Sequence, residues 1–260
     1  MSAARVDYRF PTEKLLPPEK LQNGQIPCII ATCGSYNPIT TAHVQMFTSA
    51  YDSFEKEIAG TNNFVFAGAF LSPVNDAYKK PGLAPFEHRA AICDLVLQDH
   101  SWLATDRWEG LQSEYVRSYM VLSHIRDECM KLYNRPVEVF FLCGGDLFET
   151  FYKPGCWELV LLEKIFKDFY LLVAPRTGSA NPLELVKARI EPITSEKWPD
   201  VSVNLSKYAD KVKVIAAPDS DGTEISSTLV RQKIKEGKGV DGLILPSVVE
   251  YCQANKLYQE

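Results

Sequence analysis

Two hydrophobic periods alternate along the chain from Ile26 onward. Short apolar runs rich in β-branched and aromatic residues predict strands, and they alternate with longer segments whose apolar residues recur three or four positions apart, as in amphipathic helices. The predicted strands are Cys28–Cys33, Phe64–Phe70, Trp102–Thr105, Val137–Cys143, Phe169–Ala174 and Val212–Ala216. This alternation indicates an α/β fold, a Rossmann-like doubly wound parallel sheet with helices on both faces.

The helical pattern continues to the C-terminus, where it predicts a small helical part. Helices are expected around Val44–Ile58 and Phe86–Val96 and over Ser113–Leu132, Trp157–Lys167, Pro182–Ile190, Ser226–Lys235 and Pro246–Ala254, with a polar connection around Glu191–Asp210. Residues 1–25 hold several prolines and show no clear period, which predicts an extended, poorly ordered leader. Nothing divides the remainder, so residues 26–260 are expected to form one domain.

Composition narrows the class of protein. Hydrophobic residues make up 46% of the chain and charged residues 23%, which is ordinary globular composition. The net charge is −5 and the sequence has no run of basic residues, so it predicts no positively charged surface that would bind nucleic acid or an anionic membrane. No apolar stretch reaches the length of about 18 residues that a spanning helix needs, so the chain is expected to be soluble and intracellular. Seven cysteines without a C-x-x-C pair predict reduced, mostly buried thiols.

Ligands of open parallel sheets bind beyond the carboxyl ends of the strands, so the loops after the predicted strands are informative. The first loop begins with Gly34 and Ser35 and leads into a helix start whose free N–H groups suit phosphate. His43 falls in the first helical turn and is expected to point at the same anion. The alternative interpretation is a helix capped by Thr40 or Thr41, with His43 as an ordinary surface or core residue.

Other strand-end loops carry further candidate groups. Lys80 follows the second strand and is either a phosphate ligand or a surface lysine. Gly144 and Asp146 follow the fourth strand, where a carboxylate either holds a ribose hydroxyl or a magnesium-bound water, or simply caps a helix. Arg176 follows the fifth strand and either grips a phosphate or pairs with a surface acid.

The loop after the last strand starts a second helix. It offers hydroxyl groups and a cation, which make either a second anion site or a helix cap with a solvated arginine; its residues are Ser226, Ser227, Thr228 and Arg231. Because five loops with such groups meet at one rim, the combination indicates a polyphosphate nucleotide. Neither G-x-x-x-x-G-K-[ST] nor G-x-G-x-x-G occurs, so a Walker-type NTPase and an NAD-dependent oxidoreductase have no support.

Five motifs point to a known family. Gly34–His43 and Ile225–Arg231 resemble the two ATP-binding motifs of the nucleotidylyltransferase superfamily, T/H-x-x-H and I-S-S-T-x-x-R. Ser72–Lys80, Trp108–Gln112 and Leu142–Leu147 make the chain similar to the eukaryotic-type nicotinamide mononucleotide adenylyltransferases. These matches extend over nearly the whole chain after the leader.

The resemblance implies a reaction and a set of roles. The reaction is transfer of AMP from ATP to nicotinamide mononucleotide, or its acid form, giving NAD or deamido-NAD and pyrophosphate, with Mg²⁺ as cofactor. The implied catalytic residues are His43, Arg231 and Lys80; the ATP-binding residues are Gly34, Ser35, His43, Gly144, Asp146, Ser226, Ser227, Thr228 and Arg231; the mononucleotide-binding residues are Ser35, Lys80, Tyr115, Ser118, Trp157 and Arg176. Asp146 would meet the metal through a water molecule, and Trp157 would stack on the nicotinamide ring.

Departures from the family pattern refine these expectations. Tyr115 stands where relatives commonly have tryptophan, which is expected to retune selection of the base. Thr40 stands where bacterial relatives often have histidine, a change that the eukaryotic type tolerates. The basic nuclear-import insertion of some relatives has no counterpart between Cys129 and Val137, which favours the cytoplasm and leaves the nucleus open. The family likeness also implies a homo-oligomer.

The expected mechanism has no covalent enzyme intermediate, because no residue pair resembles an activated nucleophile with its base. The substrate phosphate itself attacks the α-phosphorus of ATP in line. Two alternatives stay open. One is a nucleotidylyltransferase for another phosphate acceptor, which the aromatic pair Trp157 and Tyr115 would argue against. The other is a non-catalytic nucleotide-binding or chaperone-like protein of the same fold.

Overall fold

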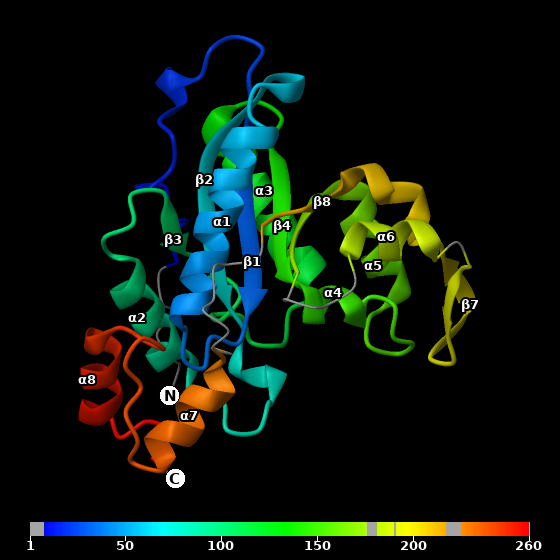
Figure 1. Ribbon diagram of the computed structural model, residues 1–260. Coiled ribbons are helices and arrows are strands. Elements are labelled where there is room, and N and C mark those ends of the chain that lie inside the picture. Colours follow the sequence, from blue (N-terminus) through cyan, green and yellow to red (C-terminus); the bar gives the residue numbers. More distant parts are fainter. Residues whose placement is uncertain (1–7, 176–180, 190, 217–224, 260) are drawn as a thin grey trace.

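A six-stranded parallel sheet forms the centre of the protein (Figure 1). The computed structural model describes residues 8–175, 181–189, 191–216 and 225–259. The strand order is β3-β2-β1-β4-β5-β8, and each neighbouring pair is parallel. The strands are β1 (Ile26–Gly34), β2 (Phe64–Pro73), β3 (Leu103–Thr105), β4 (Glu138–Gly144), β5 (Tyr170–Ala174) and β8 (Val212–Val214). All six predicted strands are therefore confirmed, with shifts of a few residues at their ends.

Helices cover both faces of this sheet. The helices of the described residues are α1 (Thr41–Glu57), α2 (Phe86–Leu97), α3 (Ser118–Tyr133), α4 (Gly145–Thr150), α5 (Leu159–Asp168), α6 (Pro182–Ala188), α7 (Ser227–Lys235) and α8 (Pro246–Ala254). Side chains of β1 alternate between two cores, because Ile29 and Ala31 pack with α3 and α5 while Cys28 and Ile30 pack with α1 and α2. The doubly wound fold is thus confirmed.

The order of the strands reverses between β1 and β4. The chain first runs from β1 outward to β2 and β3, and it then returns to the other side of β1 as β4. Both strands point toward the end of the sheet where α1 begins and where α4 and α7 lie (Figure 1). A reversal of this kind opens a crevice beyond the carboxyl ends of the two strands.

The N-terminal segment packs on the sheet core. Phe10, Leu15 and Leu21 are buried, and the Tyr133 hydroxyl donates to the Leu16 carbonyl oxygen at 2.9 Å. Apart from the short 3-10 helix η1 (Pro18–Lys20), residues 8–25 have no helix or strand. The expectation of a poorly ordered leader is therefore wrong for residues 8–25, because their scattered apolar side chains find places in the core.

Two other expectations need correction. Glu191–Asp210 is not a plain connection, since it forms the antiparallel pair β6 (Ile193–Ser195) and β7 (Trp198–Val203) and most of the 3-10 helix η4 (Leu205–Lys211). Helix α3 begins five residues later than predicted, because the Asn75 side-chain amide donates to the Gly110 carbonyl oxygen and also to that of Gln112, which holds the preceding segment as a loop.

The seven cysteines are free in the structure, and five of them are buried, which agrees with the expectation that most of these side chains are buried. Within the part of the chain that the structure describes, no helix combines the length and the apolar character that crossing a membrane requires.

Candidate active site at the carboxyl ends of the strands

The loop after β1 is closely packed around Gly34. A β-carbon at Gly34 would lie 2.9 Å from the ring of Tyr36, so this position has no room for a larger residue. Asn37 is buried, and its side chain donates to the Gly82 carbonyl oxygen at 2.7 Å and accepts from the Ala84 N–H at 3.0 Å. The loops after β1 and β2 are therefore fastened to each other at the crevice.

His43 occupies the first turn of α1, as predicted. Its Nδ1 accepts a hydrogen bond from the backbone N–H of Thr40 at 3.1 Å, and its ring meets Tyr36 edge-on at 5.3 Å. Burial lowers the pKa of the imidazole to about 4, so His43 is neutral at pH 7. Because Nδ1 accepts, Nε2 carries the proton. His43 thus offers a neutral N–H donor at the positive end of a helix.

The second predicted helix start docks against the first loop. Ser226 caps α7 by accepting from the Leu229 N–H at 3.2 Å, which agrees with the capping alternative for this residue. The Ser227 hydroxyl donates to the Pro38 carbonyl oxygen at 2.8 Å, and Arg231 Nη1 donates to the Asn37 carbonyl oxygen at 2.8 Å. These bonds join two segments almost two hundred residues apart in the sequence.

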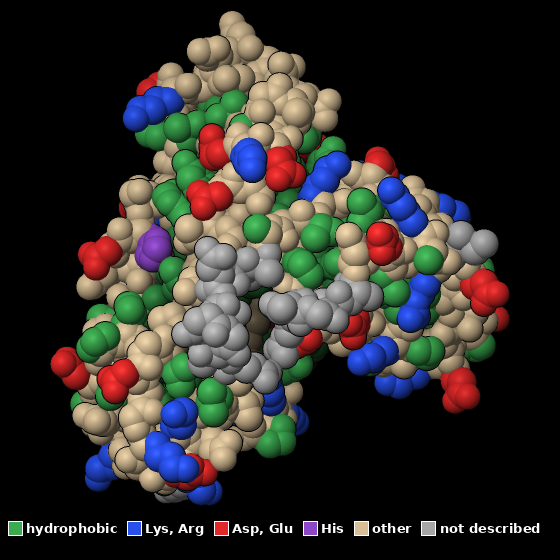
Figure 2. Space-filling model, in the orientation of Figure 1, with side chains coloured by type: hydrophobic (Ala, Val, Ile, Leu, Met, Phe, Trp, Pro, Cys, Tyr) green, Lys and Arg blue, Asp and Glu red, His purple; other side chains and the backbone are tan. Residues whose placement is uncertain are grey.

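The Arg231 guanidinium also lies near Thr228, with Nη2 at 3.4 Å from Oγ1. The structure therefore brings Arg231, Ser227 and Thr228 to the loop that contains Gly34 and Ser35. The surface is hollowed between the part that carries α7 and the lobe that carries α5, α6 and β7 (Figure 2).

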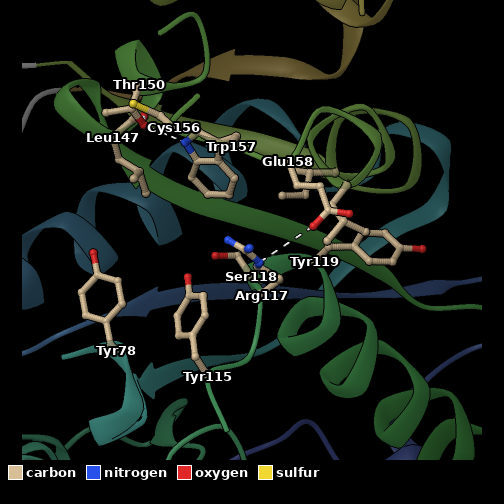
Figure 3. Close-up of a pocket in the computed structure, with 12 residues that line it drawn as sticks. Tyr78, Tyr115, Arg117, Ser118, Tyr119, Leu147, Thr150, Cys156, Trp157 and Glu158 are labelled. Atoms are coloured by element: carbon tan, nitrogen blue, oxygen red, sulfur yellow. Dashed lines mark hydrogen bonds and ion pairs between the residues drawn. The ribbon is translucent and has the colours of Figure 1, made fainter. Parts of the chain in front are cut away.

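At the same edge of the sheet lies a cavity of about 400 Å³ with aromatic walls, lined by residues that follow β2 and β3 and by residues of α4 and α5 (Figure 3). The Trp157 ring is fixed by a hydrogen bond from Nε1 to Thr150 Oγ1 at 2.9 Å and by an edge contact with Phe151 at 4.9 Å. Tyr115 stacks on Tyr78 at 5.5 Å, and Figure 3 shows both rings facing Trp157 from another wall of the cavity. The lining residues are Tyr78, Tyr115, Arg117, Ser118, Tyr119, Leu147, Thr150, Cys156, Trp157, Glu158, Leu161 and Ile165.

Three predicted mononucleotide residues, Tyr115, Ser118 and Trp157, thus line one cavity, whereas Ser35 and Lys80 do not. Lys80 is exposed in the loop after β2. Arg176 lies outside the described residues. The assigned roles of these residues stay predictions.

Gly144 ends β4 next to β1, and Asp146 lies in the first turn of α4, exposed to solvent. Among the described residues, no three His, Cys, Asp or Glu side chains come together as a metal site.

Comparison with known proteins agrees with this arrangement. Residues 31–233 match the cytidylyltransferase-like family. The nicotinamide/nicotinic acid mononucleotide adenylyltransferase of Oryza sativa is 33% identical over 98% of this chain and 96% of its own length. The chain belongs to this adenylyltransferase family. It is 34% identical over 97% of its length to adenylyltransferase 2 of Saccharomyces cerevisiae, and it spans 61% of that relative.

The solved structures with this fold include the nicotinic acid mononucleotide adenylyltransferase of Plasmodium falciparum complexed with NaAD. Its TM-score is 0.58 at 18% identity, over 89% of this chain and 97% of that one. This likeness shows that the family fold is kept.

Arg89, which belongs to no strand-end loop of the sequence, also supports the site of this family member. Its side chain is fully buried and donates to the carbonyl oxygens of Ala84 at 2.7 Å, Ser35 at 2.8 Å and Val74 at 2.6 Å. It also pairs with Asp76 Oδ1 at 2.9 Å. One guanidinium therefore joins the loops after β1 and β2. Its signal in the sequence was an arginine on the apolar face of a predicted helix, three residues after Phe86 and four before Cys93.

A buried carboxyl, Glu109, supports the end of β2. The Ser72 hydroxyl donates to Glu109 Oε2 at 2.7 Å, and both residues are buried. Burial raises the pKa of Glu109 from its ordinary value of 4.5 to about 8. Glu109 is therefore mostly protonated at pH 7.

We expect this proton to make stability depend on pH. The folded chain binds it more tightly than the unfolded chain, so the free energy of unfolding falls as pH rises from 4.5 through about 8. Glu109→Gln keeps an acceptor for Ser72 and does not titrate. Denaturant unfolding at several pH values between 6.5 and 8 measures how steeply the free energy of unfolding changes with pH. The range begins at 6.5 because this is the ordinary pKa of histidine.

The expected slope for the unmodified protein approaches about 1.4 kcal/mol per pH unit, the limit for one proton. In Glu109→Gln the slope should be clearly shallower. Equal slopes in the two proteins would show that Glu109 is ionised throughout this range.

Proposed function

We propose that this protein transfers AMP from ATP to nicotinamide mononucleotide and to nicotinic acid mononucleotide, with release of pyrophosphate. The observation that carries this proposal is the docking of α7 on the loop before α1, at the same edge of the sheet as an aromatic cavity. The two helix starts supply N–H groups, hydroxyls and Arg231 for phosphates. The cavity supplies a flat ring, Trp157, for a heteroaromatic base.

In the proposed reaction, a phosphate oxygen of the mononucleotide attacks the α-phosphorus of ATP in line. The new P–O bond forms as the bond from the α-phosphorus to the bridging oxygen breaks, and the electron pair leaves with pyrophosphate. The protein holds the two substrates in contact and stabilises charge on the departing group. His43 donates from Nε2, and Arg231 supplies a fixed positive charge.

Mg²⁺ is part of the proposal. Asp146 at the start of α4 would hold it through water, an arrangement that suits an ion bound chiefly by phosphate oxygens. When bound, the ion neutralises charge on the pyrophosphate group. Gly144, which has open space where a β-carbon would lie, lets a ligand approach the backbone beside it.

The test is a coupled assay of NAD formation from ATP, Mg²⁺ and nicotinamide mononucleotide, with the acid form run in parallel. Turnover with either mononucleotide supports the proposal. If neither is used while phosphopantetheine or a sugar-alcohol phosphate is, the acceptor is wrong and the nucleotidylyl transfer stands. Absence of turnover with every acceptor would favour a non-catalytic nucleotide-binding protein.

Trp157 should report the mononucleotide directly. Because its ring is held by Thr150 and lines the cavity, a stacked pyridine is expected to quench its fluorescence on titration with nicotinamide mononucleotide. Trp157→Ala should raise the KM for the mononucleotide by about tenfold or more, with a smaller change in the KM for ATP.

Trp198→Phe is the matched control, because Trp198 lies in β7 and does not line the cavity. The quench should persist in this variant. A quench lost in Trp198→Phe and kept in Trp157→Ala would contradict the assignment of Trp157.

A further inference from the structure

Two charged side chains, Arg117 and Glu158, stand among the twelve that line the aromatic cavity. Arg117 immediately precedes α3, and Glu158 immediately precedes α5 and follows Trp157. Their closest atoms, Arg117 Nε and Glu158 Oε2, are 3.9 Å apart across the cavity wall (Figure 3). The cavity therefore presents one positive and one negative group beside the ring of Trp157.

This ion pair is loose. Charge-assisted hydrogen bonds are usually shorter than 3 Å, and here 51% of the Arg117 side chain and 35% of the Glu158 side chain are exposed. Pairs of this kind contribute little to stability because solvent screens them. The Arg117 guanidinium is also placed by the Tyr115 ring, 5.5 Å from its centre. A second carboxylate in the cavity can therefore compete with Glu158 for Arg117.

We propose that Arg117 and Glu158 together set the preference between the acid and the amide mononucleotide. This inference rests on the proposed function. The two substrates differ at one group, since nicotinate carries a carboxylate where nicotinamide carries a neutral amide. Arg117 attracts the carboxylate and can donate two hydrogen bonds to it.

Glu158 has the opposite effect. It repels the carboxylate and accepts from the amide N–H₂ group. Because the groups lie side by side, neither substrate is excluded. Both mononucleotides thus bind in one cavity, and Arg117 and Glu158 set the ratio of kcat/KM for the acid to that for the amide.

The experiment compares kcat/KM for the acid and the amide in the full-length chain. In Arg117→Gln, the acid-to-amide ratio should fall by about tenfold, because the carboxylate loses a charged donor. In Glu158→Gln, the ratio should rise by about threefold, because a partly exposed repulsion is removed. Arg117→Lys keeps the charge without the planar fork and should give an intermediate ratio.

Lys131→Gln is the matched control. It removes one positive charge from α3, where Lys131 pairs with Glu128 at 2.6 Å and does not line the cavity. Its ratio should equal that of the unmodified protein. An unchanged ratio in both Arg117→Gln and Glu158→Gln would overturn this inference and leave the proposed function intact. Absence of turnover with either mononucleotide in the unmodified protein would overturn the proposed function instead.

Discussion

Replacing His43 by alanine is expected to lower kcat by about two to three orders of magnitude while the fold is kept. Under the proposed function, the loss follows from removing a fixed N–H donor that would face the charge developing on phosphate, an effect of about 10²–10³-fold in other enzymes. The structure defines this donor, because Thr40 occupies Nδ1 and leaves the proton on Nε2. Steady-state kinetics with ATP and nicotinamide mononucleotide measure the change.

His43→Gln tests whether the donor or the imidazole matters, because a glutamine amide also presents an N–H. We expect it to recover part of the lost kcat. His100→Ala is the control, since His100 precedes β3, which runs parallel to β2, and so lies on the side of this strand away from its carboxyl end. Its kcat should match that of the unmodified protein. A folded His43→Ala protein with near-normal kcat would remove His43 from the catalytic set.

The neutral state of His43 gives a second readout. Burial lowers the pKa of this imidazole to about 4, so the free protein keeps the same protonation state at every pH well above that value. We therefore expect the pH profile of kcat/KM near pH 6.5 to have the same shape in the unmodified protein and in His43→Gln. An inflection near pH 6.5 that is present in the unmodified protein and absent from His43→Gln would mean that His43 acts as a cation.

Local pattern predicted the sheet and both helix starts, since period and turn chemistry are encoded within short windows. Gly34 ends a strand, and His43 and Ser227 lie at the starts of the helices that follow strands, so their common edge could be inferred from the parallel sheet alone. The hairpin of β6 and β7 was not predicted, because Pro199 and Asp200 interrupt the alternation of apolar residues that indicates a strand. Its place is decided by packing, as the burial of Val203 shows.

The contacts that hold the site together were beyond sequence reasoning for a different reason. Arg231 donates to the Asn37 carbonyl oxygen and Ser227 to that of Pro38, so the partner in each case is backbone, which carries no signature in the sequence. The same holds for Arg89, which takes three of its four partners from the backbone. A cationic residue on the apolar face of a predicted helix indicates that it donates to buried acceptors, but the sequence does not show which carbonyl oxygens these are.

Replacing Arg89 is expected to have the largest effect on stability. Arg89→Ala leaves three carbonyl oxygens and the Asp76 carboxylate without their donor, and loss of one member of a buried charged network costs about 3–5 kcal/mol. Arg89→Lys keeps the charge, but an ammonium cannot reach carbonyl oxygens that a planar guanidinium spans from several sides. Equilibrium unfolding in denaturant measures both variants.

Asp76→Asn separates the ion pair from the backbone contacts. The Asp76 side chain is 57% exposed, whereas the Arg89 side chain is fully buried, so the charge on Asp76 should contribute only about 0–1 kcal/mol. We therefore expect Asp76→Asn to be nearly as stable as the unmodified protein and Arg89→Lys to be clearly less stable. The reverse order would show that the ion pair, and not the carbonyl contacts, explains the burial of Arg89.

Arg89→Lys should also lower the rate of the proposed reaction. Ser35, whose carbonyl oxygen Arg89 holds, lies in the loop that the family likeness assigns to the ATP phosphates. A displacement of about 1 Å in such a loop costs about 10²-fold in rate, so kcat/KM for ATP should fall by that order in Arg89→Lys under conditions where the variant is folded. Because Asp76→Asn leaves the Ser35 contact in place, its kcat/KM should stay within about twofold of normal. Normal kinetics in folded Arg89→Lys would limit Arg89 to stability and leave the loop after β1 to be positioned by Asn37 and α7.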